Sequence, residues 1–247
     1  MTASLPKNTA ATPRRSPLEL RSHPQLAFAY EALLSSLEVR KREHRLKRLL
    51  VTSAQPGEGK STVSVNLALT MLMAGRRVLL IDGDLRRPTI HRALGLANEV
   101  GFADLLIGKA SVEEVLQSAL FDADAAAGEG VLSVIPSGRA GRNVIHALTS
   151  AALSAAFAAV DGDYDFVVID SPPLLSVNDA TLLSPSVDGA LLVVSTGDAK
   201  VAEVRLAKER LEAAGGWVAG VVLNRFRDSL HGDGYNPYQS HYEPGPT

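Results

Sequence analysis

The sequence predicts an α/β protein with a doubly wound, mostly parallel sheet. Six apolar segments of strand length recur along the chain, with helical stretches interposed. These segments are continuously apolar instead of alternating with polar residues, which is typical of parallel strands covered by helices on both faces. We expect strands at residues 49–52, 77–81, 131–135, 166–169, 190–194 and 218–223.

Helices are predicted from apolar spacing and from end signals. The stretch 24–47 repeats apolar residues at the spacing of one helix face. The stretch 61–74 lacks Gly and Pro and is followed by Gly75, a typical C-terminal capping residue. Two further helices are expected in the Ala- and Leu-rich stretches 147–159 and 199–214. The apolar positions of the first helix are Leu26, Tyr30, Leu33, Leu34 and Leu37.

Composition indicates one soluble globular domain with tails. The 247 residues are 46% hydrophobic and 21% charged, which excludes a collagen, a coiled coil and a wholly disordered chain. The absence of cysteine excludes disulfides, thiolate metal sites and cysteine nucleophiles. No apolar run reaches membrane-spanning length and no secretory signal is found, so we expect a cytoplasmic protein. The expected parts are a flexible arm at 1–23, one folded domain at 24–228 and a flexible tail at 229–247.

The charge distribution is uneven although the net charge is only -2. Residues 1–48 carry 10 Lys and Arg against 4 Asp and Glu, and most of this basic charge lies in 40–48. Such a run can meet nucleic acid, anionic lipid or an acidic partner, or it can be the solvated end of a helix. The sequence leaves these alternatives open.

A phosphate-binding loop is predicted between the first strand and the second helix. Glycines there allow backbone N–H groups to surround phosphate oxygens, and the helix N-terminus adds its positive end. Lys60 is placed to reach the β- and γ-phosphates, and the Ser61 hydroxyl is placed to ligate Mg²⁺. The pattern departs from G-x-x-x-x-G-K-[ST] only at Ala54. The expected nucleotide-binding residues are Gly57, Glu58, Gly59, Lys60, Ser61 and Thr62.

Acidic residues follow two other predicted strands. Asp82 and Asp84 come after the second strand and Asp170 after the fourth. Ligands of open α/β sheets gather at the carboxyl ends of strands, so these side chains are expected near the phosphate loop. Their carboxylates suit a phosphate-bound metal ion and a proton acceptor.

Taken in order along the chain, these motifs resemble the cytoplasmic domain of the bacterial tyrosine kinases that control capsule and exopolysaccharide synthesis. The resemblance spans about residues 25–228. It identifies the phosphate-binding loop, the segment with Asp82 and Asp84, and the segment with Asp170 as Walker A, A′ and B motifs. It implies a P-loop sheet similar to that of partitioning and septum-site ATPases, and makes 24–228 a kinase domain. The segments on which the resemblance rests are residues 50–66, 82–88, 169–173, 178–180 and 220–225.

The resemblance also implies an activity and roles for residues. It implies an ATP- and Mg²⁺-dependent protein-tyrosine autokinase acting in polysaccharide synthesis or export. Lys60 would hold phosphates, while Ser61, Asp82 and Asp170 would organise Mg²⁺. Either Asp82 or Asp84 would accept the proton of the tyrosine hydroxyl. Asn224 would contact adenine.

The C-terminal segment carries the expected phosphate acceptors, Tyr235, Tyr238 and Tyr242, among Gly, Pro, Asn and Ser. The resemblance implies self-association, a tyrosine phosphatase as a counterpart, and a separate membrane polysaccharide co-polymerase as activator. Such an activator would recruit the kinase to the inner face of the membrane. Nucleic acid is not expected as a partner.

An alternative function is a nucleotide-switched assembly ATPase, similar to the partitioning ATPases, that acts by oligomerisation without tyrosine phosphorylation. Those ATPases supply a signature lysine to the partner's phosphates, but Gln55 stands at that position. A neutral amide cannot provide this cationic stabilisation, so the kinase is preferred. The family's helical E-x-x-R-x-x-R reads Phe28, Glu31 and Leu34 here, which leaves the oligomer size open.

Overall fold

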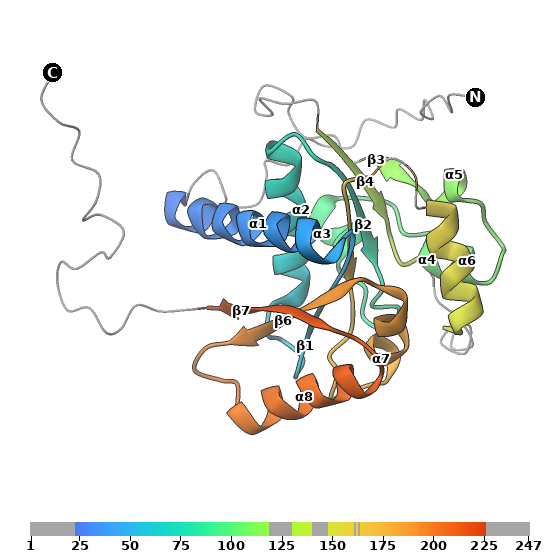
Figure 1. The fold of residues 1–247 in the computed structure, drawn as a ribbon. Helices are drawn as coiled ribbons and strands as arrows, with labels where there is room; N and C mark the ends of the chain where they lie inside the picture. Colours follow the sequence, from blue (N-terminus) through green and yellow to red (C-terminus); the bar gives the residue numbers. More distant parts are fainter. Residues whose placement is uncertain (1–22, 119–129, 140–147, 161, 163, 226–247) are drawn as a thin grey trace, which may run out of the picture.

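The computed structural model describes residues 23–118, 130–139, 148–160, 162 and 164–225 of the 247-residue chain. Its centre is a seven-stranded sheet with the order β3-β4-β2-β5-β1-β6-β7, in which only the β3–β4 pair is antiparallel (Figure 1). The strands are β1 (Arg48–Ser53), β2 (Arg77–Asp82), β3 (Gln117–Ser118), β4 (Val131–Ile135), β5 (Phe166–Asp170), β6 (Gly189–Ser195) and β7 (Val218–Asn224). The predicted mostly parallel sheet is therefore confirmed, and so are its six main strands.

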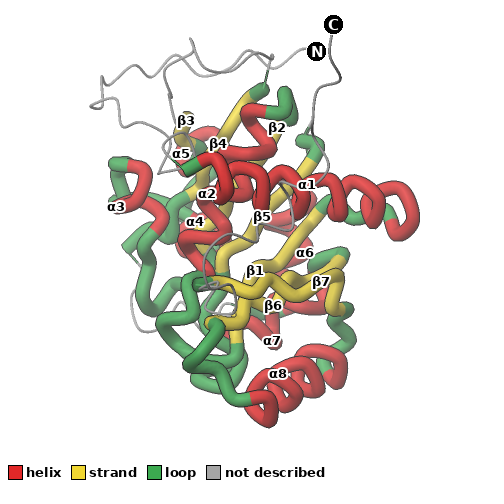
Figure 2. Tube along the Cα trace, turned by 90° about the vertical axis from the view of Figure 1, so that its left-hand side faces the viewer, coloured by secondary structure: helices red, strands yellow, loops and turns green. Residues whose placement is uncertain are grey.

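Helices cover both faces of the sheet (Figures 1 and 2). One apolar cluster packs α1, α2 and α3 against the sheet, and a second packs α4 to α8 against the other face. The helices are α1 (Pro24–His44), α2 (Lys60–Met73), α3 (Ile90–Leu94), α4 (Phe102–Leu106), α5 (Val112–Val115), α6 (Ser150–Val160), α7 (Asp179–Leu183) and α8 (Val201–Ala213), with a 3₁₀ turn at Ser184–Ser186. This two-sided cover confirms the doubly wound class and explains why the strands are continuously apolar.

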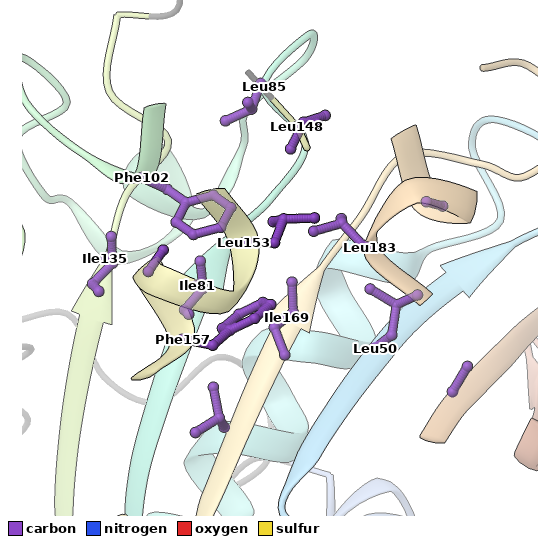
Figure 3. Close-up of a cluster of buried hydrophobic side chains, with 14 of the residues drawn as sticks. Leu50, Ile81, Leu85, Phe102, Ile135, Leu148, Leu153, Phe157, Ile169 and Leu183 are labelled. Atoms are coloured by element: carbon purple, nitrogen blue, oxygen red, sulfur yellow. The ribbon is translucent and has the colours of Figure 1, made fainter. Parts of the chain in front are cut away.

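The second of these clusters shows how the core holds the sheet. In Figure 3, Phe102 of α4 and Phe157 of α6 lie over the strand residues Ile81 and Ile169. All four side chains are at most 1% exposed, and the two aromatic rings lie 6.2 Å apart between centroids. Burying such side chains contributes about 1.5 to 3 kcal/mol each, so this layer fixes the ends of β2 and β5 that carry the acidic residues.

Helix α2 begins and ends where the sequence indicates. Gly59 has φ +94° immediately before Lys60, a conformation that glycine adopts without strain. At the other end Gly75 has φ +75°, and its N–H donates to Leu72 while the next N–H donates to Met71. This is the glycine-terminated helix end that the sequence predicts.

Two apolar residues of α1 stand where the family's E-x-x-R-x-x-R motif has charged residues, and they differ in exposure. Leu34 is 7% exposed and packs in the core, whereas Phe28 is 54% exposed. Of the basic residues that follow, Lys41 pairs with Asp165 at 3.5 Å.

Within the described residues, no helix is long and apolar enough to cross a membrane. The expected arm at 1–23 and tail at 229–247 lie outside the described residues, except His23.

The strand order reverses beside β1. This strand lies between β5 and β6, so the chain moves to one side of β1 in its first half and to the other side later. Parallel strands on both sides point their carboxyl ends to one edge, where open α/β proteins bind ligands. The loop after β1, residues 54–59, is therefore at the expected position for a binding site.

Candidate active site

A cleft of about 970 Å³ opens at the carboxyl edge of the sheet. Its walls come from the phosphate loop, the first two turns of α2, the loop after β2 and the loop after β5. The residues used below that line it are Gly57, Gly59, Lys60, Ser61, Thr62, Asp84, Arg86 and Arg87. The cleft thus joins the three sequence motifs that were expected to meet.

The phosphate loop is fixed from below by a buried carboxylate. Glu58 is 5% exposed, and its Oε2 accepts a 2.7 Å hydrogen bond from the Gln55 N–H. Its Oε1 accepts a longer one, 3.4 Å, from the Ser195 N–H at the end of β6. Glu58 therefore does not face the cleft; it ties the loop to the sheet.

Asn224 ties the same loop from the other side. Its Nδ2 donates to the Glu58 carbonyl oxygen at 2.8 Å. A Cβ atom added to Gly59 would lie 2.0 Å from that nitrogen, so a larger residue there would displace the Asn224 amide and would also be strained at φ +94°. Arg225 next to it donates to the Gly57 carbonyl at 2.7 Å. The end of β7 and the phosphate loop are therefore held together closely.

Asp170 lies beneath the start of α2 and is fully buried. Its two oxygens accept hydrogen bonds from Ser61 Oγ at 2.5 Å and Ser64 Oγ at 3.0 Å. Burial raises the pKa of Asp170 to about 6, although these hydrogen bonds and the charge of Lys60 act to lower it. The carboxylate and the hydroxyl expected to share a metal ion are thus in direct contact.

Asp82 is the register partner of Asp170 on the neighbouring strand. Its Oδ2 accepts hydrogen bonds from the N–H groups of Thr89 and Ile90, both at 3.1 Å. Its Oδ1 is buried and has no hydrogen-bond partner within the described part of the chain. Burial raises the pKa of Asp82 to about 8, and the nearby Asp170 charge adds to the rise. A cation bound next to this buried carboxyl group would strongly stabilise its ionised form.

Asp84 differs from the other two carboxylates because it reaches the cleft. It is 9% exposed, and its Oδ1 accepts the N–H groups of Arg86 at 3.3 Å and Arg87 at 2.9 Å. Asp84 is thus placed where a bound reactant can meet a carboxylate oxygen.

The donor set fits Mg²⁺ bound together with phosphates. The described residues contain no cluster of three or more His, Cys, Asp or Glu side chains able to hold a metal ion by themselves. Mg²⁺ is usually bound by one or two carboxylates, waters and substrate phosphates, which needs no such cage. The unpartnered Asp82 Oδ1, the Asp170 carboxylate and the Ser61 hydroxyl provide suitable oxygens.

Comparison with known proteins shows the family. A family model described as an AAA domain matches residues 47–200. The chain is 34% identical over 231 residues to tyrosine-protein kinase YwqD of Bacillus subtilis (strain 168), covering 93% of this chain and 94% of that one. It is 32% identical over 212 residues to putative tyrosine-protein kinase CapB of Staphylococcus aureus, covering 85% and 90%. The chain belongs to the bacterial tyrosine-protein kinases.

Solved structures agree with this assignment. The kinase domain of Escherichia coli tyrosine kinase ETK superposes with a TM-score of 0.75 at 29% identity, covering 93% of this chain and 89% of that one. The septum-site-determining protein MinD of Pyrococcus horikoshii, solved with Mg-ADP, superposes with a TM-score of 0.61 at 26% identity, covering 73% and 71%. The kinase fold is therefore similar to that of the septum-site ATPases, as the sequence predicts.

The kinase cleft contains most, but not all, of the residues expected from the sequence. Gly57, Gly59, Lys60, Ser61, Thr62 and Asp84 line it, while Asp82 and Asp170 lie beneath it. Glu58 and Asn224 support the loop and do not line the cleft. The acceptor candidates Tyr235, Tyr238 and Tyr242 lie outside the described residues.

Sequence reasoning missed an ion pair at the cleft wall, in which a partly exposed arginine is bound to a buried carboxylate. Arg86 donates from Nε to Asp179 Oδ2 at 2.8 Å and from Nη2 to Oδ1 at 3.1 Å. Asp179 is 2% exposed, and the pair joins the loop after β2 to the start of α7. The arginine directly after the acidic box was the available signal, but nothing in the sequence names its partner.

Proposed function

We propose that this kinase transfers the γ-phosphoryl group of ATP to tyrosine, including Tyr235, Tyr238 and Tyr242 of its own C-terminal segment. The observation that carries the proposal is the position of Asp84 in the same cleft as Lys60 and Ser61. One carboxylate at the phosphate end of a nucleotide site is what transfer to a hydroxyl requires. Family membership supports the same activity.

Nucleotide binding would use the loop and its supports. The N–H groups of the loop and the Lys60 ammonium would bind the phosphates, because the N-terminus of α2 adds its positive end there. Asn224 would contact the adenine through its Oδ1, because its Nδ2 already donates a hydrogen bond to the Glu58 carbonyl. Within the described residues, Oδ1 has no hydrogen-bond partner.

Mg²⁺ would be held by Ser61 and by the carboxylates of Asp82 and Asp170. When bound, it neutralises charge on the β- and γ-phosphates. The Ser61 hydroxyl and Asp170 are pre-aligned by their 2.5 Å hydrogen bond. The raised pKa of Asp82 means that binding the cation also releases a proton near neutral pH.

Asp84 is the better of the two candidates for the base. Asp82 is 0% exposed and its Oδ2 is occupied by backbone N–H groups, whereas Asp84 lines the cleft. The tyrosine oxygen would attack the γ-phosphorus while the bond to the β–γ bridging oxygen breaks and ADP leaves. The phenolic proton would pass to the Asp84 carboxylate.

Family membership supports a proposal for the partners of the kinase and for the process in which it acts. Self-association would bring the C-terminal segment of one subunit to the cleft of another, where a tether raises the local concentration of acceptor tyrosines. We propose a role in capsule or exopolysaccharide synthesis or export, with a separate membrane co-polymerase as activator and recruiter and a tyrosine phosphatase that reverses the reaction. Nucleic acid has no part in this proposal.

The alternative assembly ATPase is less well supported. Gln55 Nε2 lies 3.3 Å from Glu203 Oε2 of α8, so its side chain is engaged on this subunit. The amide therefore offers neither the charge nor the orientation of a signature lysine.

Mass spectrometry of the full chain from its own cells tests the proposal. We expect phosphate on Tyr235, Tyr238 or Tyr242 in the wild type and none in the Lys60→Met variant. The matched control is Lys109→Met, because Lys109 is exposed and does not line the cleft. Unmodified tyrosines in cells that make polysaccharide would refute the kinase proposal and favour the assembly ATPase.

A further inference from the structure

The cleft contains three cations among its described lining residues, and only one lacks a charged partner. Lys60 interacts with Asp170, whose pKa its charge lowers. Arg86 is held by the buried Asp179 through two hydrogen bonds of 2.8 and 3.1 Å. The Arg87 side chain is exposed, and within the described residues it makes no hydrogen bond or ion pair. Its positive charge is therefore available to a reactant.

The phosphate end of the cleft needs a further cation. Asp84 lines the cleft, Asp82 and Asp170 lie beneath it, and a nucleoside triphosphate adds several negative charges. Lys60 and one Mg²⁺ offset only part of this charge, while the charge of Arg86 is already balanced. A charge that develops in the transition state must then be met by a group that is still free.

Position 55 does not supply that cation. Gln55 is neutral and does not line the cleft, and its amide contacts Glu203 of α8 at 3.3 Å. The phosphate loop therefore contributes Lys60 as its one charged side chain facing the cleft among the described residues. The second cation has to come from another loop.

Arg87 is fixed close to the base by its own backbone. Its N–H donates to Asp84 Oδ1 at 2.9 Å, and the preceding N–H donates to the same oxygen at 3.3 Å. The carboxylate proposed as the proton acceptor and the backbone of Arg87 thus belong to one hydrogen-bonded turn. A phosphoryl group passing to a hydroxyl beside Asp84 comes within reach of an arginine side chain.

We propose that Arg87 is a catalytic residue that contacts the transferred phosphoryl group and stabilises its charge in the transition state. The inference rests on the proposed function. The bonds that form and break are those given above, and the guanidinium donates hydrogen bonds without transferring a proton. A planar guanidinium donates two parallel hydrogen bonds to phosphoryl oxygens, which a lysine cannot do.

Kinetics of the full chain test the proposal. We expect Arg87→Ala to lower kcat by about 100-fold, both for tyrosine phosphorylation and for ATP hydrolysis without an acceptor, with KM for ATP changed less than about 3-fold. Arg87→Lys should recover part of the loss. Arg92→Ala is the matched control, since Arg92 is exposed, five residues further on, does not line the cleft and donates to the Pro88 carbonyl.

A binding experiment provides a readout independent of turnover. Mg-ADP with aluminium fluoride mimics the transition state of phosphoryl transfer. We expect Arg87→Ala to weaken binding of this complex by about the same 100-fold factor, and to leave Mg-ADP binding unchanged, as measured by calorimetry.

The outcomes separate the two proposals. Equal weakening of ADP and of the fluoride complex, or equal loss of activity in Arg92→Ala, would overturn the role of Arg87. A change confined to KM for a tyrosine acceptor, with acceptor-free hydrolysis intact, would assign Arg87 to acceptor docking and also overturn it. Failure of the proposed function is distinct, because Tyr235, Tyr238 and Tyr242 would then be unmodified in the wild type, or equally modified in Lys60→Met.

Discussion

The buried carboxylate of Asp82 makes the stability of the nucleotide-free kinase depend on pH. Its pKa is about 8 in the folded chain, against 3.8 ordinarily, because burial and the Asp170 charge disfavour ionisation. The folded state therefore keeps a proton that the unfolded state has lost. The stability that this proton provides is complete at acid pH and is lost as the pH rises through 8.

The size of the effect follows from proton linkage. Between about pH 6.5 and 7.5 the folded state holds nearly one more proton at Asp82, so the free energy of unfolding should fall by about 1 kcal/mol per pH unit. Asp170 contributes little in this window because its pKa is about 6. In Asp82→Asn the amide oxygen still accepts the N–H groups of Thr89 and Ile90, but no charge can develop.

The assay is guanidinium unfolding of both proteins across this pH range, without nucleotide or divalent cations. We expect the stability of the wild type to fall relative to that of Asp82→Asn by about 1 kcal/mol per pH unit. Other titrating groups, such as His91, cancel in the comparison. Parallel pH dependences in the two proteins would refute the argument from burial.

Three further changes test the support of the site. Gly59→Ala should abolish nucleotide binding measured by calorimetry, because its Cβ would meet Asn224 Nδ2 at 2.0 Å. The control is Gly57→Ala, which also has a positive φ but would place its Cβ with no atom within 4 Å, and which should bind nucleotide more tightly than Gly59→Ala. Equal affinities of the two variants would contradict this prediction. Asp179→Ala should reduce the free energy of unfolding by about 1 to 3 kcal/mol because its arginine partner loses two hydrogen bonds, and an unchanged denaturation midpoint would count against the pair. Phe157→Ala should cost about 3 to 5 kcal/mol in the same measurement, since it empties the buried layer under β2 and β5; a loss below about 1 kcal/mol would show that this layer does not hold them.

The main strands and the meeting of the acidic residues were predictable because both follow from general geometry. Parallel strands bring their carboxyl ends to one edge, so Asp82 and Asp170 had to lie close together. The structure adds that they are register partners. Continuous apolar runs predicted the strands because helices cover both faces of the sheet.

Smaller features were not predictable from the sequence. Strand β3 has 2 residues and α3, α4, α5 and α7 have 4 or 5, which is too short for a periodic pattern. The pairing of Arg86 with Asp179 and the contact of Glu58 with the Ser195 N–H depend on which elements pack together. Local sequence contains no record of these contacts, because the partners are separated along the chain.

The links between β7 and the phosphate loop have a consequence for the order of folding. Asn224 and Arg225 bond to Glu58 and Gly57 across 166 and 168 residues of sequence. The loop leaves the ribosome early, but the last strand that supports it emerges only near the end of synthesis. During translation the nascent kinase therefore carries an incomplete loop, and its affinity for nucleotide should develop only when β7 has joined the sheet.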